Sequence, residues 1–407
     1  MKIAEIRTLL MQAPLAGETA WGGENHSSSD HTAGSRNWLF VEIVTECGLS
    51  GIGECSGWPR VVERAVADLA ELLIGDDVFQ SERIWQKMLN AMMGHGQTGT
   101  VGFGAMTGID MALWDLKGKA LNTPVYNLLG GKIRDQVKVY VHAGSAQSAA
   151  KAVKNGYSIV KLGGIKNIVS KTEAVRRVVG NEVDIAVDLH GPAWLSPKDA
   201  VAVGQALEPF DLLFLEDPVA PEYPEGLRAV GERVNIPLAA GERKGGIWSY
   251  RELLSLGVNV LQPDTGRCGG ITQMKKIAAL AEAEFATIAP HAGSLGPVGE
   301  YAALHVMASI PNCLSMERFQ RDCDLKEQII DYPIDVSGGK LVVPDRPGLG
   351  VALNKDLVKK YPSKRNVSIP GSPDSGDYEN GTFNEHVYFQ PKYSRASFLN
   401  SKRNTKN

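Results

Sequence analysis

The chain has 407 residues, of which 43% are hydrophobic and 22% are charged, and its formal net charge is −3. This composition predicts a globular protein with one large and one smaller domain, and it excludes a disordered tail or a mini-protein. A nearly balanced charge gives no electrostatic basis for binding nucleic acid or a membrane surface, so we expect a small-molecule partner.

The cysteines and the N-terminal residues indicate the cellular compartment. Five cysteines are scattered without a CxxC spacing, which argues against a disulfide framework and against a zinc ribbon. Residues 1–20 contain no continuous apolar core followed by a cleavage site, and no stretch approaches the roughly 18 apolar residues of a membrane-spanning helix. We therefore expect a cytoplasmic protein.

The first part of the chain, residues 1–125, is predicted to form a small α+β domain. Residues 2–11 and 38–46 alternate like two strands, and a long segment rich in Gly, Ser, Asn and His lies between them at 15–37. Residues 58–93 have a helical pattern, and apolar residues then recur at steps of three and four over 103–116. Loops as long as 15–37 are usually functional or mobile.

The middle of the chain, residues 126–330, is predicted to form a barrel. Short β-branched runs alternate here with polar turns and helical stretches, as in βαβ units around a parallel sheet. Eight such runs, with no Gly-rich phosphate loop after the first, favour a TIM barrel over an open doubly wound sheet. The predicted strands lie at 137–144, 157–164, 183–191, 212–218, 236–242, 258–264, 285–291 and 313–318.

The end of the chain divides into two segments. Residues 338–353 have the pattern of a β-turn element that returns to the first domain, so we expect about 331–361 to complete that domain. Residues 362–407 are rich in Ser and Asn with scattered aromatic residues, and they are predicted to form a polar C-terminal extension. Such an extension is either poorly ordered or an arm whose aromatic residues dock on a neighbouring subunit.

An ionisable residue ends most of the predicted barrel strands. These residues are Lys161, Asp188, Glu216, Glu242, Asp264, His291 and Glu317. Active sites of TIM barrels are built at the C-terminal ends of their strands. Any one of these carboxylates could be a helix cap or a solvated charge, but together they are expected to converge on one mouth. Like charges gathered there are unfavourable without a cation between them.

Asp188, Glu216 and Glu242 follow three consecutive predicted strands, so they should be neighbours on one side of the mouth. Three hard oxygen ligands with room for water suit Mg²⁺, and zinc is not expected without cysteine ligands. His190 follows Asp188 by two residues, which keeps its imidazole near the same end. We expect it to have a catalytic role there, although a lone histidine is more often structural.

Asp264 and His291 end adjacent predicted strands. A carboxylate that is hydrogen-bonded to a histidine fixes its tautomer and raises its basicity. The pair therefore predicts a general base.

The sequence resembles the enolase superfamily, specifically its mandelate racemase subgroup and, within it, the sugar-acid dehydratases similar to galactonate dehydratase. The resemblance covers roughly residues 1–355. It rests on the motifs GIDMALWDLKGKALNTPVYNLLGG (108–131), VDLHG (187–191), LEDP (215–218), AAGER (239–243), QPDTGRCGGIT (262–272), APH (289–291) and MER (316–318).

This resemblance implies an α+β capping domain over a modified TIM barrel of the (β/α)7β type, and it implies a homo-oligomer. It implies Mg²⁺ held by the residues matching Asp188, Glu216 and Glu242. It further implies a dyad of His291 and Asp264, with Glu317 near the substrate carboxylate.

Two features of the motifs bear on the reaction. Members that racemise or lactonise usually present a KxK pair on the second barrel strand, whereas this chain has Lys161-Leu162-Gly163. Racemisation between two opposed bases therefore lacks a partner, and Lys161 is expected to contact the substrate carboxylate or to supply positive charge. In members similar to galactonate dehydratase, the histidine matching His190 is the acid that helps a hydroxyl leave.

The expected activity is therefore that of a Mg²⁺-dependent sugar-acid dehydratase. His291, oriented by Asp264, removes the proton α to the carboxylate, and Glu317, if kept protonated, donates a hydrogen bond to the enediolate. His190 then protonates the departing β-hydroxyl, and the product tautomerises to a 2-keto-3-deoxy acid.

Three alternatives compete with dehydration. A cycloisomerase of a sugar-acid lactone or anhydro-sugar acid uses the same enediolate, a non-catalytic metal-binding scaffold needs no base, and an aldolase uses Lys161 as a Schiff-base amine. In the family, loops of the capping domain close over the mouth. That implicates Trp21, His26, His31 and Arg36 in segment 15–37, and the turn around His95, in binding a polyhydroxylated acid, unless they are simply solvated.

Overall fold

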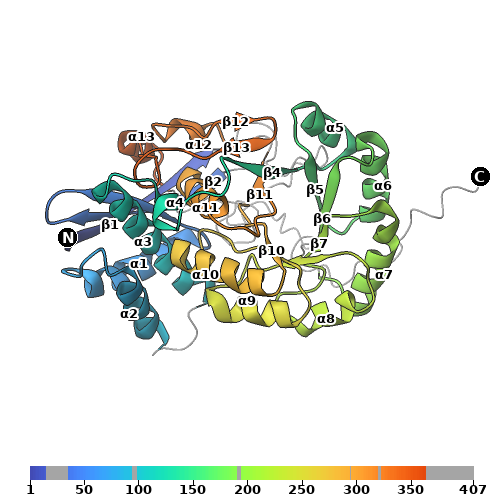
Figure 1. Cartoon of the computed structure of the whole chain (residues 1–407), viewed down its shortest axis with the longest axis horizontal. Coiled ribbons are helices and arrows are strands. Elements are labelled where there is room, and N and C mark those ends of the chain that lie inside the picture. The colour runs from blue at the N-terminus through green and yellow to red at the C-terminus, as the bar shows by residue number, and fades with distance from the viewer. Residues whose placement is uncertain (15–34, 94–98, 190–193, 294, 320–321, 364–407) are drawn as a thin grey trace, which may run out of the picture.

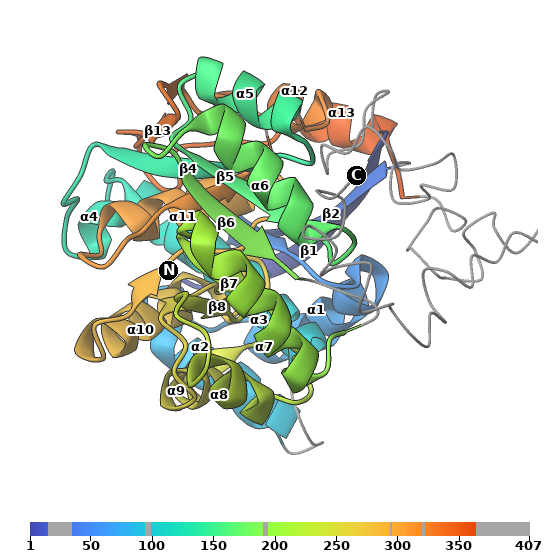
Figure 2. The same ribbon diagram turned by 90° about the vertical axis from the view of Figure 1, so that its right-hand side faces the viewer.

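The computed structural model describes the chain except for residues 15–34, 94–98, 190–193, 294, 320–321 and 364–407. Figure 1 shows an N-terminal domain beside a barrel whose strands are surrounded by an arc of helices. The view in Figure 2 shows helices α5, α6 and α7 lying on the outside of strands β4 to β7. Within the described residues no helix is both long and apolar enough to cross a membrane.

The N-terminal domain is built on a three-stranded antiparallel sheet in the order β1-β2-β3. Its strands are β1 (Ile3–Pro14), β2 (Ser35–Thr45) and β3 (Ser50–Cys55), and its helices are α1 (Pro59–Leu73), α2 (Ser81–Met93) and α3 (Gly99–Ala120). The apolar stripe predicted over 103–116 lies on α3, which is buried on almost every side because it packs on β3 and on barrel helix α10 (Gly270–Ala283). A Cβ at Gly53 would lie 2.0 Å from the carbonyl oxygen of Gly108, so this close packing requires glycine.

The barrel consists of eight parallel strands, and each of the eight predicted runs overlaps one of them. They are β4 (Gln136–His142), β5 (Ile159–Gly163), β6 (Asp184–Asp188), β7 (Phe214–Glu216), β8 (Leu238–Ala240), β9 (Val260–Leu261), β10 (Thr287–Ile288) and β11 (Met316–Arg318). Neighbours along the chain pair in order from β4 to β10. The ring closes because β11 pairs with β4 and a parallel bridge joins Ile288 to Cys313.

One helix follows each of the first seven strands, which gives the predicted (β/α)7β order. These helices are α5 (Ala146–Lys154), α6 (Ile168–Val179), α7 (Pro197–Leu207), α8 (Glu225–Gly231), α9 (Gly246–Ser255), α10 and α11 (Pro297–Ala308). The short helix α4 (Val125–Leu128) precedes the barrel, and a 3-10 turn (Glu208–Phe210) follows α7.

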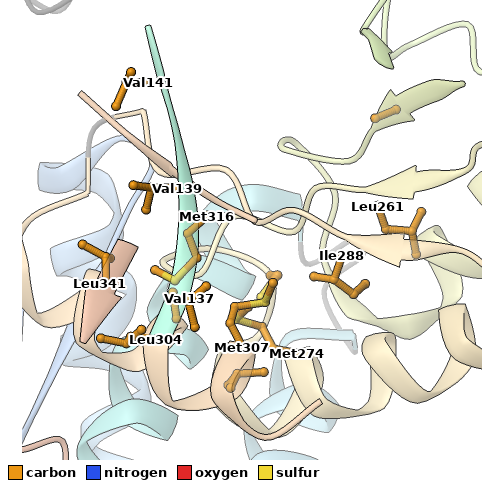
Figure 3. Close-up of a cluster of buried hydrophobic side chains, with 14 of the residues drawn as sticks. Val137, Val139, Val141, Leu261, Met274, Ile288, Leu304, Met307, Met316 and Leu341 are labelled. Carbon is orange, nitrogen blue, oxygen red and sulfur yellow. The ribbon is translucent and has the colours of Figure 1, made fainter. Parts of the chain in front are cut away.

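Two apolar cores hold the barrel together. Inside the ring, Tyr140, Ile159, Ala186, Phe214, Ala239, Val260 and Ala289 form a separate buried cluster. Outside the ring, Val137, Val139 and Val141 of β4 belong to the core between the strands and the helices, as Figure 3 shows beside Leu304 and Met307 of α11. Because successive strand residues point to opposite faces, burial on both faces produces the apolar runs seen in the sequence.

The segment after the barrel contacts barrel strand β4 before it reaches the first domain. Strands β12 (Val336–Ser337) and β13 (Lys340–Val342) form a hairpin, and β13 pairs antiparallel with the first half of β4. That half is available because β11 pairs only with residues 139–141, and an unpaired strand edge favours pairing.

The return to the N-terminal domain occurs after this hairpin. The backbone N–H of Leu349 donates to Asp115 of α3 over 2.8 Å, and Pro362 bridges to Met11 of β1. Helices α12 (Leu325–Gln328) and α13 (Lys355–Lys360) lie in this part of the chain. The predicted extension 362–407 falls almost entirely outside the described residues, and the domain boundaries themselves stay predictions.

Candidate active site

Three carboxylates gather around one buried amine at the C-terminal ends of the barrel strands. Lys161 on β5 is 1% exposed, and its Nζ lies 2.6 Å from Glu317 Oε1, 3.0 Å from Glu216 Oε2 and 3.3 Å from Asp188 Oδ2. The sheet register places Asp188 directly beside Glu216. Burial alone would lower the pKa of Lys161, but the three carboxylates outweigh burial and raise it, so the amine is a cation.

Negative charge exceeds positive charge in this cluster. Burial and the charge of Asp188 outweigh the attraction of Lys161 and raise the pKa of Glu216 to about 8. The neighbouring Asp217 is also buried, with a left-handed φ of 42°, and its Oδ2 has no hydrogen-bond partner among the described residues. Burial, followed by the charges of Glu242 and Glu216, raises the pKa of Asp217 well above its usual range.

The predicted metal ligands Asp188, Glu216 and Glu242 end or follow three consecutive strands, and all three are buried. The charge of Glu242 contributes to the raised pKa of Glu216, which indicates that the two carboxylates face a common space. As the side chains stand, no group of three described His, Cys, Asp or Glu residues is arranged to hold an ion. The donor set and its excess negative charge nevertheless have the chemistry that Mg²⁺ requires.

His291 and Asp264 form the predicted pair. Asp264 Oδ2 lies 2.7 Å from His291 Nδ1. Asp264 also accepts hydrogen bonds from Arg267, from the backbone N–H of Gly266 and from the hydroxyl of Ser56, each over 2.8 Å. Burial would raise the pKa of Asp264, but the charge of Arg267 and the bonds from Arg267 and His291 hold it well below its usual range. An ionised Asp264 keeps the Nδ1 proton on His291.

The opposite ring nitrogen of His291 is directed at the carboxylates of the mouth. Its Nε2 is 3.2 Å from Glu242 Oε2 and 3.9 Å from Glu317 Oε2. Burial opposes the charged form, but Glu242, Glu317 and Asp264 together raise the pKa of His291 to about 9. Nε2 is therefore the nitrogen that can exchange a proton at the mouth.

Glu317 lies among donors that favour its ionised form. Its Oε2 accepts from the backbone N–H of Ala292 over 2.7 Å, and its Oε1 lies 2.7 Å from His142 Nε2 as well as beside Lys161. Although burial works against ionisation, Lys161, His291 and His142 hold the pKa of Glu317 well below its usual range. These surroundings favour the ionised form, so the expected hydrogen bond from a protonated Glu317 to an enediolate stays a prediction.

The expectation that Lys161 contacts a substrate carboxylate stays a prediction. Its amine is enclosed by protein carboxylates, so the structure supports the supply of positive charge more directly than substrate contact.

Three residues that were not predicted also contact predicted site residues: His142, Ser56 and Arg267. His142 ends β4 and stacks on Phe319 with 4.5 Å between the ring centres. It is the last ionisable residue of its predicted strand, so the rule that found the other residues could have found it. Ser56 belongs to the other domain, and no spacing in the sequence connects it with Asp264.

Other predicted residues lie around or outside the described site. Arg36 is buried, and its guanidinium lies 4.9 Å from the centre of the Phe319 ring and 3.2 Å from Asp322. His190 falls outside the described residues. Trp21, His26, His31 and His95 fall outside them as well.

Comparison with known proteins identifies the family. Residues 18–130 match the family model "Mandelate racemase / muconate lactonizing enzyme, N-terminal domain", and residues 144–357 match "Enolase C-terminal domain-like". The D-galactonate dehydratase of Xanthomonas campestris pv. campestris (strain B100) is 35% identical over 350 residues, which cover 79% of this chain and 90% of that protein. The D-galactonate dehydratase of Variovorax paradoxus (strain S110) is 36% identical with the same coverage.

Solved structures agree with this match. A mandelate racemase/muconate lactonizing enzyme from Jannaschia sp. CCS1 has a TM-score of 0.79 and 31% identity, over 90% of this chain and 99% of that chain. The 3,6-anhydro-D-galactonate cycloisomerase from Zobellia galactanivorans has a TM-score of 0.79 and 27% identity, over 89% of this chain and all of that chain. The chain therefore belongs to the mandelate racemase/muconate lactonizing enzyme family and is an enzyme of the enolase superfamily.

Proposed function

We propose that this enzyme is a Mg²⁺-dependent sugar-acid dehydratase, a hydro-lyase that forms a 2-keto-3-deoxy acid. The observation that carries the proposal is the placement of His291, whose Nδ1 is 2.7 Å from Asp264 while Nε2 faces the carboxylates of the mouth. Relatives named D-galactonate dehydratase support a sugar acid as the substrate class.

The chemical difficulty lies in removing a weakly acidic proton next to a carboxylate. Nε2 of His291 takes this proton, while Asp264 retains the hydrogen bond to Nδ1 and stabilises the imidazolium that forms. Mg²⁺ held by Asp188, Glu216 and Glu242 would supply positive charge to the enediolate and would neutralise the Glu242 charge that favours protonated His291.

Lys161 and Glu317 have supporting roles in this proposal. Lys161 provides a fixed positive charge next to the carboxylates of Glu216 and Glu317. Glu317 joins Lys161 and His142 to the backbone of Ala292, the residue after His291, and so helps to fix the loop that carries the base. His190 is the proposed acid that protonates the leaving β-hydroxyl, and this assignment rests on the family resemblance.

Racemisation has less support than dehydration. Gly163 lies two residues after Lys161 on β5, where racemising relatives usually carry a second lysine, and a Cβ at Gly163 would meet no atom of the described residues within 4 Å. Because glycine has no side chain, residue 163 cannot act as a second base. A Schiff-base aldolase is also disfavoured, because a nucleophilic amine must lose its proton and the partners of Lys161 keep it charged.

Cycloisomerisation of a lactone or anhydro-sugar acid is the second candidate. The fold similarity to the Zobellia galactanivorans cycloisomerase favours keeping it, and His291 could abstract the proton in either reaction. The two reactions differ in whether a hydroxyl or a ring oxygen leaves. A non-catalytic scaffold has no support from the site, where the His291–Asp264 pair is fully assembled.

A substrate screen tests the proposal. The purified protein with Mg²⁺ is incubated with a stereochemically complete library of aldonic and aldaric acids, and semicarbazide detects 2-keto-3-deoxy products. A parallel set of lactones and 3,6-anhydro-sugar acids is followed by NMR, and the His291→Asn variant serves as the inactive control. Turnover only in the second set would replace dehydration by cycloisomerisation. Homo-oligomerisation and a cytoplasmic location stay predictions.

A further inference from the structure

The N-terminal domain contributes directly to the hydrogen bonds of the His291–Asp264 pair. Ser56 follows the last residue of β3 and is 6% exposed. Its hydroxyl donates to Asp264 Oδ1 over 2.8 Å, and its backbone N–H donates to the carbonyl of Gly266 over 2.8 Å. The two domains are therefore joined at the carboxylate that orients the proposed base.

We propose that Ser56 is a positioning residue, through which the N-terminal domain fixes the orientation of Asp264 and thereby of the His291 imidazole. This proposal rests on the assignment of His291 as the base. Oδ2 of Asp264 contacts His291 and Arg267, whereas Oδ1 accepts from Ser56 and from the backbone of Gly266. Partners on both oxygens restrict rotation of the carboxylate about its Cβ–Cγ bond.

The same strand end also holds the segment after His291. Glu54, two residues before Ser56, is 1% exposed and accepts from the backbone N–H groups of Gly296 and Gly299, the latter over 2.9 Å. These N–H groups belong to the first turn of α11, where a carboxylate satisfies unpaired helix donors. Glu54 thus anchors the helix that follows the loop of His291, while Ser56 holds the partner of His291.

Close packing makes these contacts sensitive to the position of the N-terminal domain relative to the barrel. A Cβ at Gly266 would lie 2.6 Å from the Cβ of Ser56, and a Cβ at Gly296 would lie 3.0 Å from both carboxylate oxygens of Glu54. The end of β3 therefore packs against glycine backbone at Gly266 and at Gly296. A small displacement of the N-terminal domain would move the Ser56 hydroxyl away from Asp264 and the Glu54 carboxylate away from the first turn of α11.

The test compares Ser56→Ala with Ser56→Thr, which retains a hydroxyl. In protein labelled with ¹⁵N-histidine and free of substrate, the Nδ1–H resonance of His291 is assigned by its loss in His291→Asn. We expect Ser56→Ala to displace or broaden this resonance and Ser56→Thr to restore it. With a substrate from the screen, Ser56→Ala should lower kcat by up to about 10²-fold and leave KM nearly unchanged.

Thr107→Ala is the matched control. Thr107 is fully buried on α3 at the same domain interface, where its hydroxyl accepts from the backbone N–H of Gly269 over 2.9 Å. This variant also loses a buried hydroxyl, but it should leave the His291 resonance unchanged. If Ser56→Ala is too unstable to measure, Ser56→Cys replaces the hydroxyl with a weaker donor of similar size.

The outcomes separate the two proposals. An unchanged His291 resonance in Ser56→Ala, or an equal change in Thr107→Ala, would overturn the positioning role. A specific change in Ser56→Ala in a protein that dehydrates no sugar acid would support positioning of the dyad while rejecting the proposed reaction.

Discussion

Replacing Lys161 with methionine should strongly destabilise the folded protein. Methionine retains most of the length of the side chain but removes the charge that three carboxylates share. Those carboxylates, on Asp188, Glu216 and Glu317, are all buried. The variant therefore leaves negative charge in the barrel without its principal compensating cation.

The expected magnitude follows from the distances. At 2.6 Å, as for the amine and Glu317, and with an effective dielectric constant of about 20, one pair contributes roughly 6 kcal/mol of Coulomb attraction. Desolvation of the amine and repulsion among the carboxylates offset most of the total. Removal of one partner from a buried ion pair costs about 3–5 kcal/mol, which we take as the expected loss in the free energy of unfolding.

Urea unfolding at pH 8 without added metal measures this loss, and Lys276→Met is the control. Lys276 also pairs with a glutamate, Glu82, at 2.7 Å, but the side chains are 39% and 59% exposed. An exposed pair contributes about 0–1 kcal/mol, so the control should unfold almost like the parent protein. At pH 5 the deficit of Lys161→Met should shrink, because the buried carboxyls then take up protons. Equal losses in the two variants at pH 8 would refute the reasoning.

Three further predictions address the site and its surroundings. His291→Asn should lower kcat by about 10²–10⁴-fold in steady-state kinetics. Thermal unfolding should show that Mg²⁺ stabilises this variant as much as the parent protein. Substantial retained turnover would exclude His291 as the base. Mg²⁺ at about 100 times its Kd should raise the free energy of unfolding of the parent protein by about 2.7 kcal/mol, and that of Glu216→Gln far less. An equal increase in both proteins would reject Glu216 as a ligand. Burial raises the pKa of Glu54 from 4.5 to about 7, so the folded protein binds a proton on this carboxyl more tightly than the unfolded chain does. The stability that results is fully present below pH 4.5 and is lost as the pH rises through 7. That loss amounts to about 3 kcal/mol. In urea unfolding, the free energy of unfolding of Glu54→Gln should change less with pH in this window than that of the parent protein. The same pH dependence in both proteins would contradict this assignment.

The barrel could be predicted from the sequence because its strands are buried on both faces and appear as apolar runs. Strand β3 could not, since Gly51 and Gly53 replace the β-branched residues that indicate a strand. Those glycines are required by α3, whose backbone lies against them. Likewise, the pairing of β13 with β4 depends on an edge left open by β11, which no local pattern reveals.

The candidate site was predictable to the extent that it follows strand ends. The rule that ionisable groups gather there identified Lys161, Asp264 and His291, which the structure brings into contact with other predicted residues. The lowered pKa of Glu317 was not predictable, because it depends on groups of β4, β5 and the loop after β10 that contact its carboxylate. The role of Ser56 depends on how two domains dock, which the spacing of residues along one chain does not encode.

The open space at Gly163 bears on how reactions diverge within this barrel. Residues 161 and 163 point to the same face of β5, and residue 163 is exposed, with no neighbour in the described part of the chain that a Cβ would strike. A longer side chain could therefore be introduced there without rearranging the barrel. In the proposed reaction the α-proton leaves from one side, and a basic side chain at residue 163 would place a proton acceptor on a second strand of the mouth. In evolutionary terms, the glycine leaves the stereochemical course of this scaffold open to change.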